Sequence, residues 1–230
     1  GADYDEWSPE RDSIIPFKYH KNDISGKYAN TRALSARCGF NNDGAPILGM
    51  IGRLVEQKGV KFIIETIDRL MSKNLKIVIL GAGDKNIENI LLSFNNRFPK
   101  IFKAFIMFNA ELAHLIEAGS DIYLMPSLFE PCGLNQLYSL RYGTIPLVRR
   151  TGGLADTVVD CNPANINAGI GTGFVFNNIS NLEFADKVDY ALSLYSNKEL
   201  WRKLMYNAMS QDWSWNLSGD KYIQLYKSLL

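Results

Sequence analysis

The sequence predicts an α/β fold organised as a doubly wound parallel sheet. Short apolar runs alternate with stretches whose apolar residues recur three and four positions apart. The runs show little polar alternation, as expected for strands that helices cover on both faces. Right-handed crossovers would place every loop that leads from a strand into a helix at one edge of the sheet. Ligands of open α/β sheets bind at that edge.

Each expected strand is an apolar run that ends at a glycine, a proline or a polar turn. The expected strands are residues 47–51, 77–80, 101–107, 121–125, 145–148 and 173–176. The clearest expected helix, from Val60 to Met71, carries its apolar residues on one stripe. The expected helices are residues 27–38, 60–71, 85–97, 111–118, 133–142, 181–195, 198–210 and 217–229. The stretches 151–154 and 161–172 are rich in turn-forming residues and are expected to be loops.

The pattern indicates one domain preceded by a connector. Residues 1–45 carry scattered apolar anchors in a polar segment punctuated by proline. We expect this segment to be a strap over the surface, or a connector that arrives from another domain. The regular alternation occupies residues 46–230, and it ends in helices. No second apolar core is evident in the sequence.

Bulk composition argues against several function classes. A net charge of +1 gives no general attraction to nucleic acid or to an anionic membrane, and no apolar run approaches the ~18 residues of a membrane span. Cys38, Cys132 and Cys161 are too few and too scattered for a disulfide framework or a zinc site, which favours a reducing compartment. The acidic, polar opening is not a secretory signal. Because it lacks an initial Met, we expect a fragment or a processed chain.

Three short motifs have ordinary explanations. Asp3-Tyr4-Asp5 matches a D-x-D metal motif, but no strand precedes it, so we interpret the match as coincidence. Gly81-Ala82-Gly83 follows a strand, as in dinucleotide-binding proteins, but the third glycine is replaced by Asn86, so a tight turn is the better interpretation. His20 and His114 lack the spacing of metal ligands, and we interpret His114 as structural.

The stretch from Ser127 to Tyr138 is the first candidate site. It follows an apolar strand, carries Glu130 in a loop with a proline, and enters a helix near Gly133. The first N–H groups of a helix favour anions. A carboxylate repels phosphate, but it can accept hydrogen bonds from sugar hydroxyls. The alternative is an acidic loop that only caps a helix. Cys132 would line the site rather than act as a nucleophile.

The loop from Gly52 to Gly59 is the second candidate. Arg53 and Lys58 flank a connection between a strand and a helix at the same edge of the sheet. A guanidinium offers a planar fork of donors and an ammonium a mobile point charge. Together they could neutralise a diphosphate without a metal. The alternative is two solvated surface cations.

Four long motifs, in order, closely resemble those of bacterial glycogen synthases and plant starch synthases. The motifs are residues 52–59, 80–84, 126–134 and 141–158, and the likeness runs from Asp3 to Trp215, so it covers essentially the whole chain. The resemblance implies the C-terminal, Rossmann-like lobe of a two-lobed glycosyltransferase fold, GT-B, with residues 46–230 as its nucleotide-sugar-binding domain. It implies retaining transfer of glucose from ADP-glucose to the non-reducing end of an α-1,4-glucan, without a cofactor or an essential metal.

The resemblance also implies roles for individual residues. Arg53 and Lys58 would stabilise the ADP leaving group, and Glu130 would bind the donor glucose. Substrate would contact Gly52, Phe108, Cys132, Gly133, Leu134, Asn135 and Tyr138. In this set Phe108 takes the place of a Tyr that stacks on adenine, and Asn135 replaces a commoner Thr. At Tyr138, related transferases have a Glu for the ribose, so a ribose-binding carboxylate is in doubt.

The expected partners are ADP-glucose, an α-glucan acceptor and the N-terminal lobe of the same enzyme, with no nucleic acid and no membrane. That lobe would supply a Lys-containing glycine loop, a catalytic His and an Asp. Two alternatives stay open: a stand-alone module that binds ADP or a nucleotide sugar without catalysis, and a transferase that uses a UDP-sugar. The expected location is the cytoplasm, or the plastid in a plant or alga.

Overall fold

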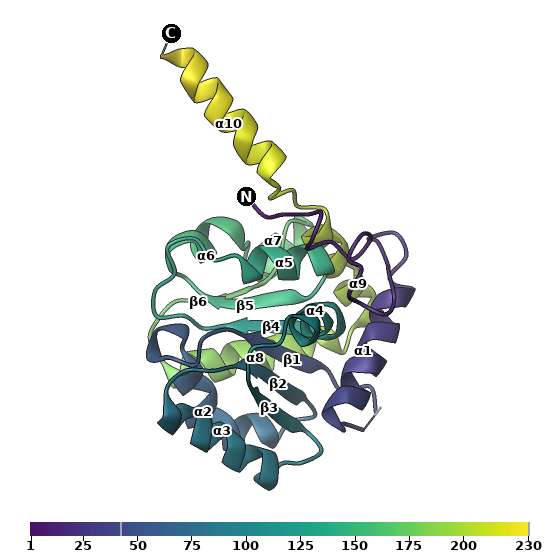
Figure 1. The fold of residues 1–230 in the computed structure, drawn as a ribbon, viewed down its shortest axis with the longest axis vertical. Coiled ribbons are helices and arrows are strands. Elements are labelled where there is room, and N and C mark those ends of the chain that lie inside the picture. The colour runs from purple at the N-terminus through teal and green to yellow at the C-terminus, as the bar shows by residue number, and fades with distance from the viewer. Residues whose placement is uncertain (42, 230) are drawn as a thin grey trace.

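The computed structural model describes residues 1–41 and 43–229 and confirms the doubly wound sheet (Figure 1). Asn42, in the expected connector, and Leu230, at the end of the expected domain, lie outside the described residues. Six parallel strands take the order β3-β2-β1-β4-β5-β6. They are β1 (Ile47–Ile51), β2 (Lys76–Gly81), β3 (Phe102–Ile106), β4 (Ile122–Met125), β5 (Ile145–Arg149) and β6 (Phe174–Phe176). The order reverses between β1 and β4, as in dinucleotide-binding folds.

Every expected helix is present, with ends shifted by a few residues. The helices are α1 (Ser25–Cys38), α2 (Val60–Met71), α3 (Lys85–Arg97), α4 (Ala110–Gly119), α5 (Asn135–Tyr142), α6 (Gly152–Thr157), α7 (Pro163–Asn167), α8 (Asn181–Tyr195), α9 (Lys198–Met209) and α10 (Trp215–Ser228), with the short 3-10 helix η1 (Glu56–Lys58). The expectation of loops at 151–154 and 161–172 is wrong, because α6 begins at Gly152 and α7 at Pro163.

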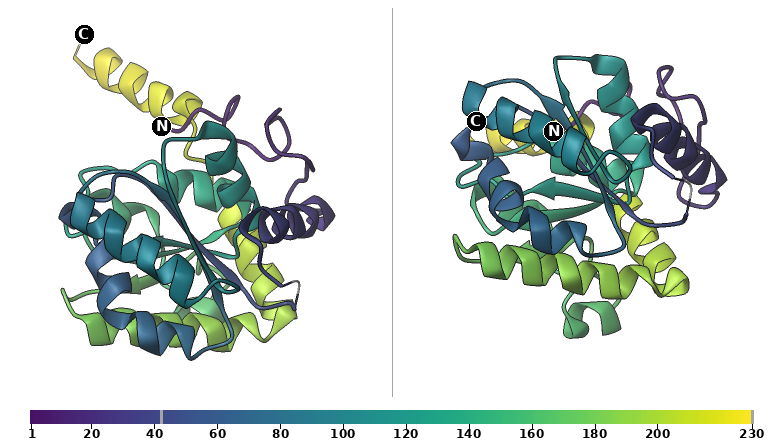
Figure 2. Two further views of the ribbon diagram at one scale, coloured as in Figure 1. Left: turned by 60° about the horizontal axis from the view of Figure 1, so that its bottom comes forward. Right: turned by 90° about the horizontal axis from the view of Figure 1, so that it is seen from below.

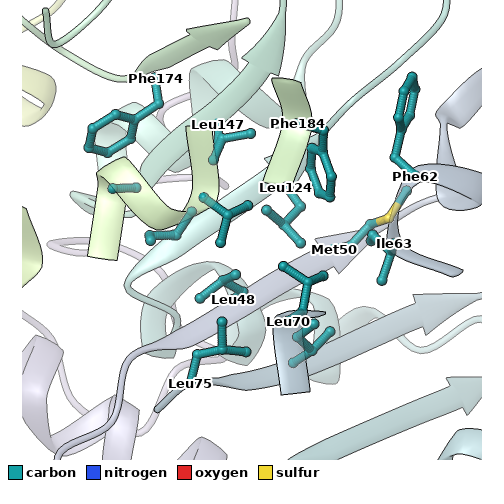
Figure 3. Packing of buried hydrophobic residues seen from close by; sticks show 14 of the residues in the cluster. Leu48, Met50, Phe62, Ile63, Leu70, Leu75, Leu124, Leu147, Phe174 and Phe184 are labelled. Atoms are coloured by element: carbon teal, nitrogen blue, oxygen red, sulfur yellow. The ribbon is translucent and has the colours of Figure 1, made fainter. Parts of the chain in front are cut away.

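Helices cover both faces of the sheet (Figure 2). Alternate strand residues pack into one or the other of the two cores that result. On one face, strand residues such as Leu48, Met50 and Leu124 pack against α2 and α8 (Figure 3). On the other face, Ile47 and Val78 pack against α1 and α4. Both faces are therefore dry, which explains why the strands read as continuous apolar runs.

The N-terminal segment crosses the surface of α4 and α5 as a strap. The indole of Trp7 stacks on the ring of His114, with centroids 3.8 Å apart. His114 Nδ1 lies 2.8 Å from Asp12 Oδ2, and the Tyr142 hydroxyl donates to the same oxygen. His114 is buried and holds the strap, which agrees with its structural interpretation. The boundary between a connector ending at 45 and a domain beginning at 46 stays a prediction.

A buried carboxyl group lies where α1, α4 and α5 meet. Glu117 is fully buried, and the Ser139 hydroxyl donates to its Oε2 at 2.8 Å. Burial raises the pKa of Glu117 from 4.5 to about 8, which the Ser139 hydrogen bond and the charge of Lys27 only partly offset. The Lys27 ammonium, also buried, donates to Thr144 Oγ1 at 2.7 Å and to the carbonyl oxygen of Ala118 at 3.2 Å.

Replacement of Glu117 by Gln should flatten the pH dependence of stability between pH 5 and pH 8. In this window Glu117 keeps its proton in the folded chain but has lost it in the unfolded chain. The stability that this difference contributes is fully present below about pH 4.5 and is lost as pH rises through 8. The parent should lose at most about 1.4 kcal/mol of unfolding free energy per pH unit relative to Glu117→Gln. Urea unfolding at several pH values measures this. Glu111→Gln, an exposed change on the same helix, should keep the parent's slope.

The last helix, α10, extends away from the rest of the molecule (Figure 1). None of its residues is buried, although it carries Trp215, Leu217, Tyr222, Ile223 and Tyr226. At its base, Ala2 pairs with Ser214, so the start of the chain lies beside the start of α10. Across residues 1–41 and 43–229, no helix has the length and apolarity needed to cross a membrane.

Candidate functional site

Two loops meet where the strand order reverses, at the carboxyl ends of β1 and β4. The loop after β1 holds Arg53 and Lys58, and the loop after β4 holds Glu130. They are joined directly: the N–H of Leu128 donates to the carbonyl oxygen of Gln57 at 2.8 Å, and the Gln57 carboxamide donates to the carbonyl oxygen of Phe129 at 3.1 Å. The two stretches that sequence singled out therefore form one surface.

Glycines set the path of the loop after β1. Gly59 adopts φ +70, and a Cβ there would overlap the carbonyl oxygen of Pro126. Cβ atoms at Gly81 and Gly83 would likewise overlap carbonyl oxygens of Gly52 and Leu54. The Gly81-Ala82-Gly83 motif thus lets the loops after β1 and β2 approach each other. The Glu88 carboxylate accepts the N–H of Gly83 at 2.8 Å, a position that a dinucleotide phosphate would need.

Lys58 and Glu130 form an ion pair at the junction of the two loops. Lys58 Nζ lies 2.6 Å from Glu130 Oε2, and the side chains are 21% and 10% exposed. The Ser127 hydroxyl donates to the same oxygen at 3.3 Å. The pair holds the Glu130 carboxylate in one place while leaving part of the ammonium open to solvent. An ammonium has three donors, so it can serve a second acceptor.

The first turn of α5 presents backbone donors to the same region. Within residues 1–41 and 43–229, no hydrogen-bond acceptor partners the N–H groups of Gly133, Leu134, Asn135 and Gln136. Gly133 adopts φ +75, so the helix begins at Asn135 rather than at Gly133 as expected. The buried carboxamide of Gln136 donates to the carbonyl oxygens of Cys132 and Gly133, at 3.0 and 3.1 Å, and so holds the turn from inside.

These groups surround a small cavity of about 90 Å³. It is lined by Met50, Ile51, Gly52, Lys58, Tyr123, Leu124, Met125, Ser127, Glu130, Gly133, Leu134 and Asn135. Six residues that sequence nominated are among them. The cavity combines an ammonium, a carboxylate and a helix N-terminus, so it can accept an anion and hydroxyl groups side by side.

Four nominated residues lie outside the lining of this cavity. Arg53 is exposed, and its Nη2 donates to Gln57 Oε1 at 3.3 Å, within the loop that also carries Lys58. Phe108 is 95% exposed beyond the end of β3. Cys132 is exposed, and its thiol donates to the carbonyl oxygen of Gly133 at 3.3 Å. The Tyr138 ring stacks on Trp7 with centroids 4.3 Å apart.

Two polar residues at the cavity, Tyr123 and Ser127, received no role from sequence reasoning. Tyr123 is fully buried beneath it, and Ser127 contacts Glu130. A signal for Tyr123 was present, because a tyrosine in an otherwise aliphatic buried strand needs a partner for its hydroxyl. Ser127 gave no comparable signal.

The D-x-D motif is engaged in local contacts. Asp3 Oδ1 accepts the N–H of Asp5 at 2.9 Å, and the Asp5 carboxylate pairs with Arg11. In the part of the chain that the structure describes, no group of three or more His, Cys, Asp or Glu side chains is arranged to hold a metal ion.

Comparisons with known proteins show which family the sequence and the fold belong to. The family model described as "Glycosyl transferases group 1" matches residues 36–211. The chain is 42% identical over 231 residues to glycogen synthase 2 of Nitrosococcus oceani, and 44% identical over 230 residues to the glycogen synthase of Kosmotoga olearia. These matches cover 100% of this chain but 47% and 48% of the relatives. The chain thus spans about half the length of the curated relatives it matches.

A solved structure also resembles this chain over nearly its whole length and over about half of its own. The catalytic domain of starch synthase IV from Arabidopsis thaliana, bound to ADP and acarbose, superimposes with a TM-score of 0.92 at 33% identity. The match covers 99% of this chain and 48% of that one. Because the family model matches more than half of the chain, the chain belongs to the group 1 glycosyl transferases.

Proposed function

We propose that this chain is the C-terminal, donor-binding lobe of a glycogen or starch synthase. The complete enzyme would transfer glucose from ADP-glucose to the non-reducing end of an α-1,4-glucan with retention of configuration. The observation that carries the proposal is the shared cavity, where the Lys58–Glu130 pair faces the unpartnered N–H groups at the start of α5. The names of the similar glycogen synthases support it.

The proposal gives each group a role. Arg53 and Lys58 neutralise the charge that grows on ADP as the glycosidic bond breaks. The N–H groups of residues 133–135 bind phosphate oxygens, and Glu130 accepts hydrogen bonds from glucose hydroxyls. Phe108, exposed on the loop after β3 at the same edge, offers a ring face to the base. In this proposal the site needs no cofactor and no metal, because Arg53, Lys58 and the N–H groups at the start of α5 would together stabilise the diphosphate.

The second half of the enzyme would be the lobe that covers this edge of the sheet. We propose that α10 packs against that lobe, because its apolar side chains are exposed and the chain spans about half of its relatives' length. Acceptor binding and the remaining catalytic groups would come from the other lobe. Such an enzyme would work in the cytoplasm, or in the plastid of a plant.

Nucleotide binding by the isolated chain tests the donor assignment. Calorimetry should show that ADP binds, that adenosine binds at least about tenfold more weakly for lack of the diphosphate, and that UDP displaces ADP only at higher concentration. Equal competition by UDP would contradict the choice of ADP-glucose.

In a second assay with radiolabelled ADP-glucose and glycogen, the chain alone should transfer no glucose. Transfer of glucose by the chain alone would contradict its assignment as one lobe of two.

A further inference from the structure

On the side that faces β4, the end of β1 is held by a side chain rather than by the strand itself, whereas β2 pairs with β1 as far as Ile51. Strands β1 and β4 pair only through Leu48 with Ile122 and Gly49 with Tyr123. Beyond that point, the N–H of Ile51 donates to the Tyr123 hydroxyl at 3.1 Å, and the hydroxyl donates to the carbonyl oxygen of Ile51 at 2.9 Å. One hydroxyl thus takes the place of a rung of the sheet where the two strands diverge.

The side chain of Asn135 extends this arrangement to α5. Its carboxamide donates to the carbonyl oxygen of Ile51 at 3.1 Å and also to the Tyr123 hydroxyl. The Tyr123 oxygen therefore makes one donated and two accepted bonds, which is the full capacity of a hydroxyl. Burial raises the pKa of Tyr123 well above its ordinary value, so the hydroxyl keeps its proton and can donate.

The three residues join the two halves of the candidate site. Ile51 immediately precedes Gly52 and Arg53, and Asn135 carries one of the unpartnered N–H groups of α5. Ile51, Tyr123 and Asn135 all line the cavity, so their hydrogen bonds form its floor. The core itself does not need this hydroxyl, since β4 is otherwise covered by apolar contacts.

We propose that the Tyr123 hydroxyl and the Asn135 carboxamide are positioning groups that fix the separation between the Gly52–Lys58 loop and the N-terminus of α5, and so fit the site to the phosphates of a nucleoside diphosphate. This inference rests on the proposed function. Neither side chain needs to touch the ligand. Binding groups must be held within about 0.5 Å of their working geometry by supporting side chains, and these two supply that support.

Tyr123→Phe tests the proposal, because it removes one oxygen and keeps the ring. Calorimetry on the chain should show roughly a tenfold loss of affinity for ADP and no change for adenosine, which lacks the phosphates. Tyr19→Phe is the matched control, since Tyr19 is also buried and its hydroxyl donates to the carbonyl oxygen of Tyr142 at 2.8 Å, away from the cavity. It should change neither affinity.

Asn135→Ala is a second test, because it removes the carboxamide and keeps the backbone N–H. It should weaken ADP binding by a similar factor. The double variant with Tyr123→Phe should bind ADP little more weakly than either single variant, because each change breaks the same hydrogen-bond network. Unchanged ADP affinity in both single variants, with the parent still preferring ADP to adenosine, would overturn this inference and leave the proposed function standing. A parent that does not prefer ADP would overturn both.

Discussion

Arg53→Ala and Lys58→Ala should each lower the turnover of the complete two-lobed enzyme by at least about 100-fold. The leaving diphosphate gains negative charge as the donor is cleaved, and donors fixed in advance at that charge are usually the largest catalytic contribution. Steady-state transfer of glucose from ADP-glucose to glycogen measures the effect. Turnover within a few-fold of the parent in either variant would contradict the assignment of that cation to the diphosphate.

The two variants should differ in stability. This difference separates a loss of turnover caused by the missing charge from one caused by unfolding. Arg53 is exposed, so its removal should cost little. Removal of Lys58 leaves the buried Glu130 carboxylate with only the Ser127 hydroxyl, at a cost of about 1–3 kcal/mol in unfolding free energy. Lys61→Ala is the matched control: Lys61 lies on the following helix and forms an exposed pair with Glu65 at 3.4 Å. Both its turnover and its stability should stay near the parent's.

Gly59→Ala should destabilise the chain by about 3 kcal/mol and disturb the site at the same time. Gly59 adopts φ +70, and its Cβ would overlap the carbonyl oxygen of Pro126, which belongs to the loop that carries Glu130. Relief of that overlap would push the two loops apart next to Lys58. Denaturant unfolding measures the stability, and ADP calorimetry measures the site.

Gly39→Ala separates the cost of the left-handed backbone conformation from the cost of the overlap with Pro126. Gly39 adopts nearly the same backbone conformation, φ +73, but a Cβ there has nothing within 4 Å. It should cost only the ~1–2 kcal/mol of a left-handed residue and leave ADP binding unchanged. If Gly59→Ala cost no more than Gly39→Ala, the close approach of the two loops would not matter for stability.

The architecture was predictable because the strands are buried on both faces. The run Ile77-Val78-Ile79-Leu80 could be assigned without knowledge of its neighbours, and handedness then placed the loops with Arg53 and Glu130 at one edge. The short helices were not predictable in the same way. Gly152 and Gly153 disfavour a helix locally, but Cβ atoms there would overlap carbonyl oxygens of Glu130 and Cys132, so close packing requires glycine at the start of α6.

Pairings between distant residues account for what sequence reasoning missed in the site. Lys58 and Glu130 are 72 positions apart, and nothing in the sequence indicates that they form an ion pair. Tyr138 was nominated from its place after Glu130, yet its ring stacks on Trp7 of the strap. For α7, by contrast, a signal was available, since Asn162 caps the helix and Pro163 occupies its first turn.

The exposure of α10 affects how this lobe melts when it is alone. A helix of this length that buries nothing has marginal intrinsic stability. Its helicity should fray at temperatures where the sheet is intact, so the far-ultraviolet circular dichroism of the lone chain combines two transitions. The fluorescence of Trp201, which is buried beside Phe174, should report the unfolding of the sheet. The fluorescence of Trp215, which is exposed at the base of α10, should report the fraying of that helix.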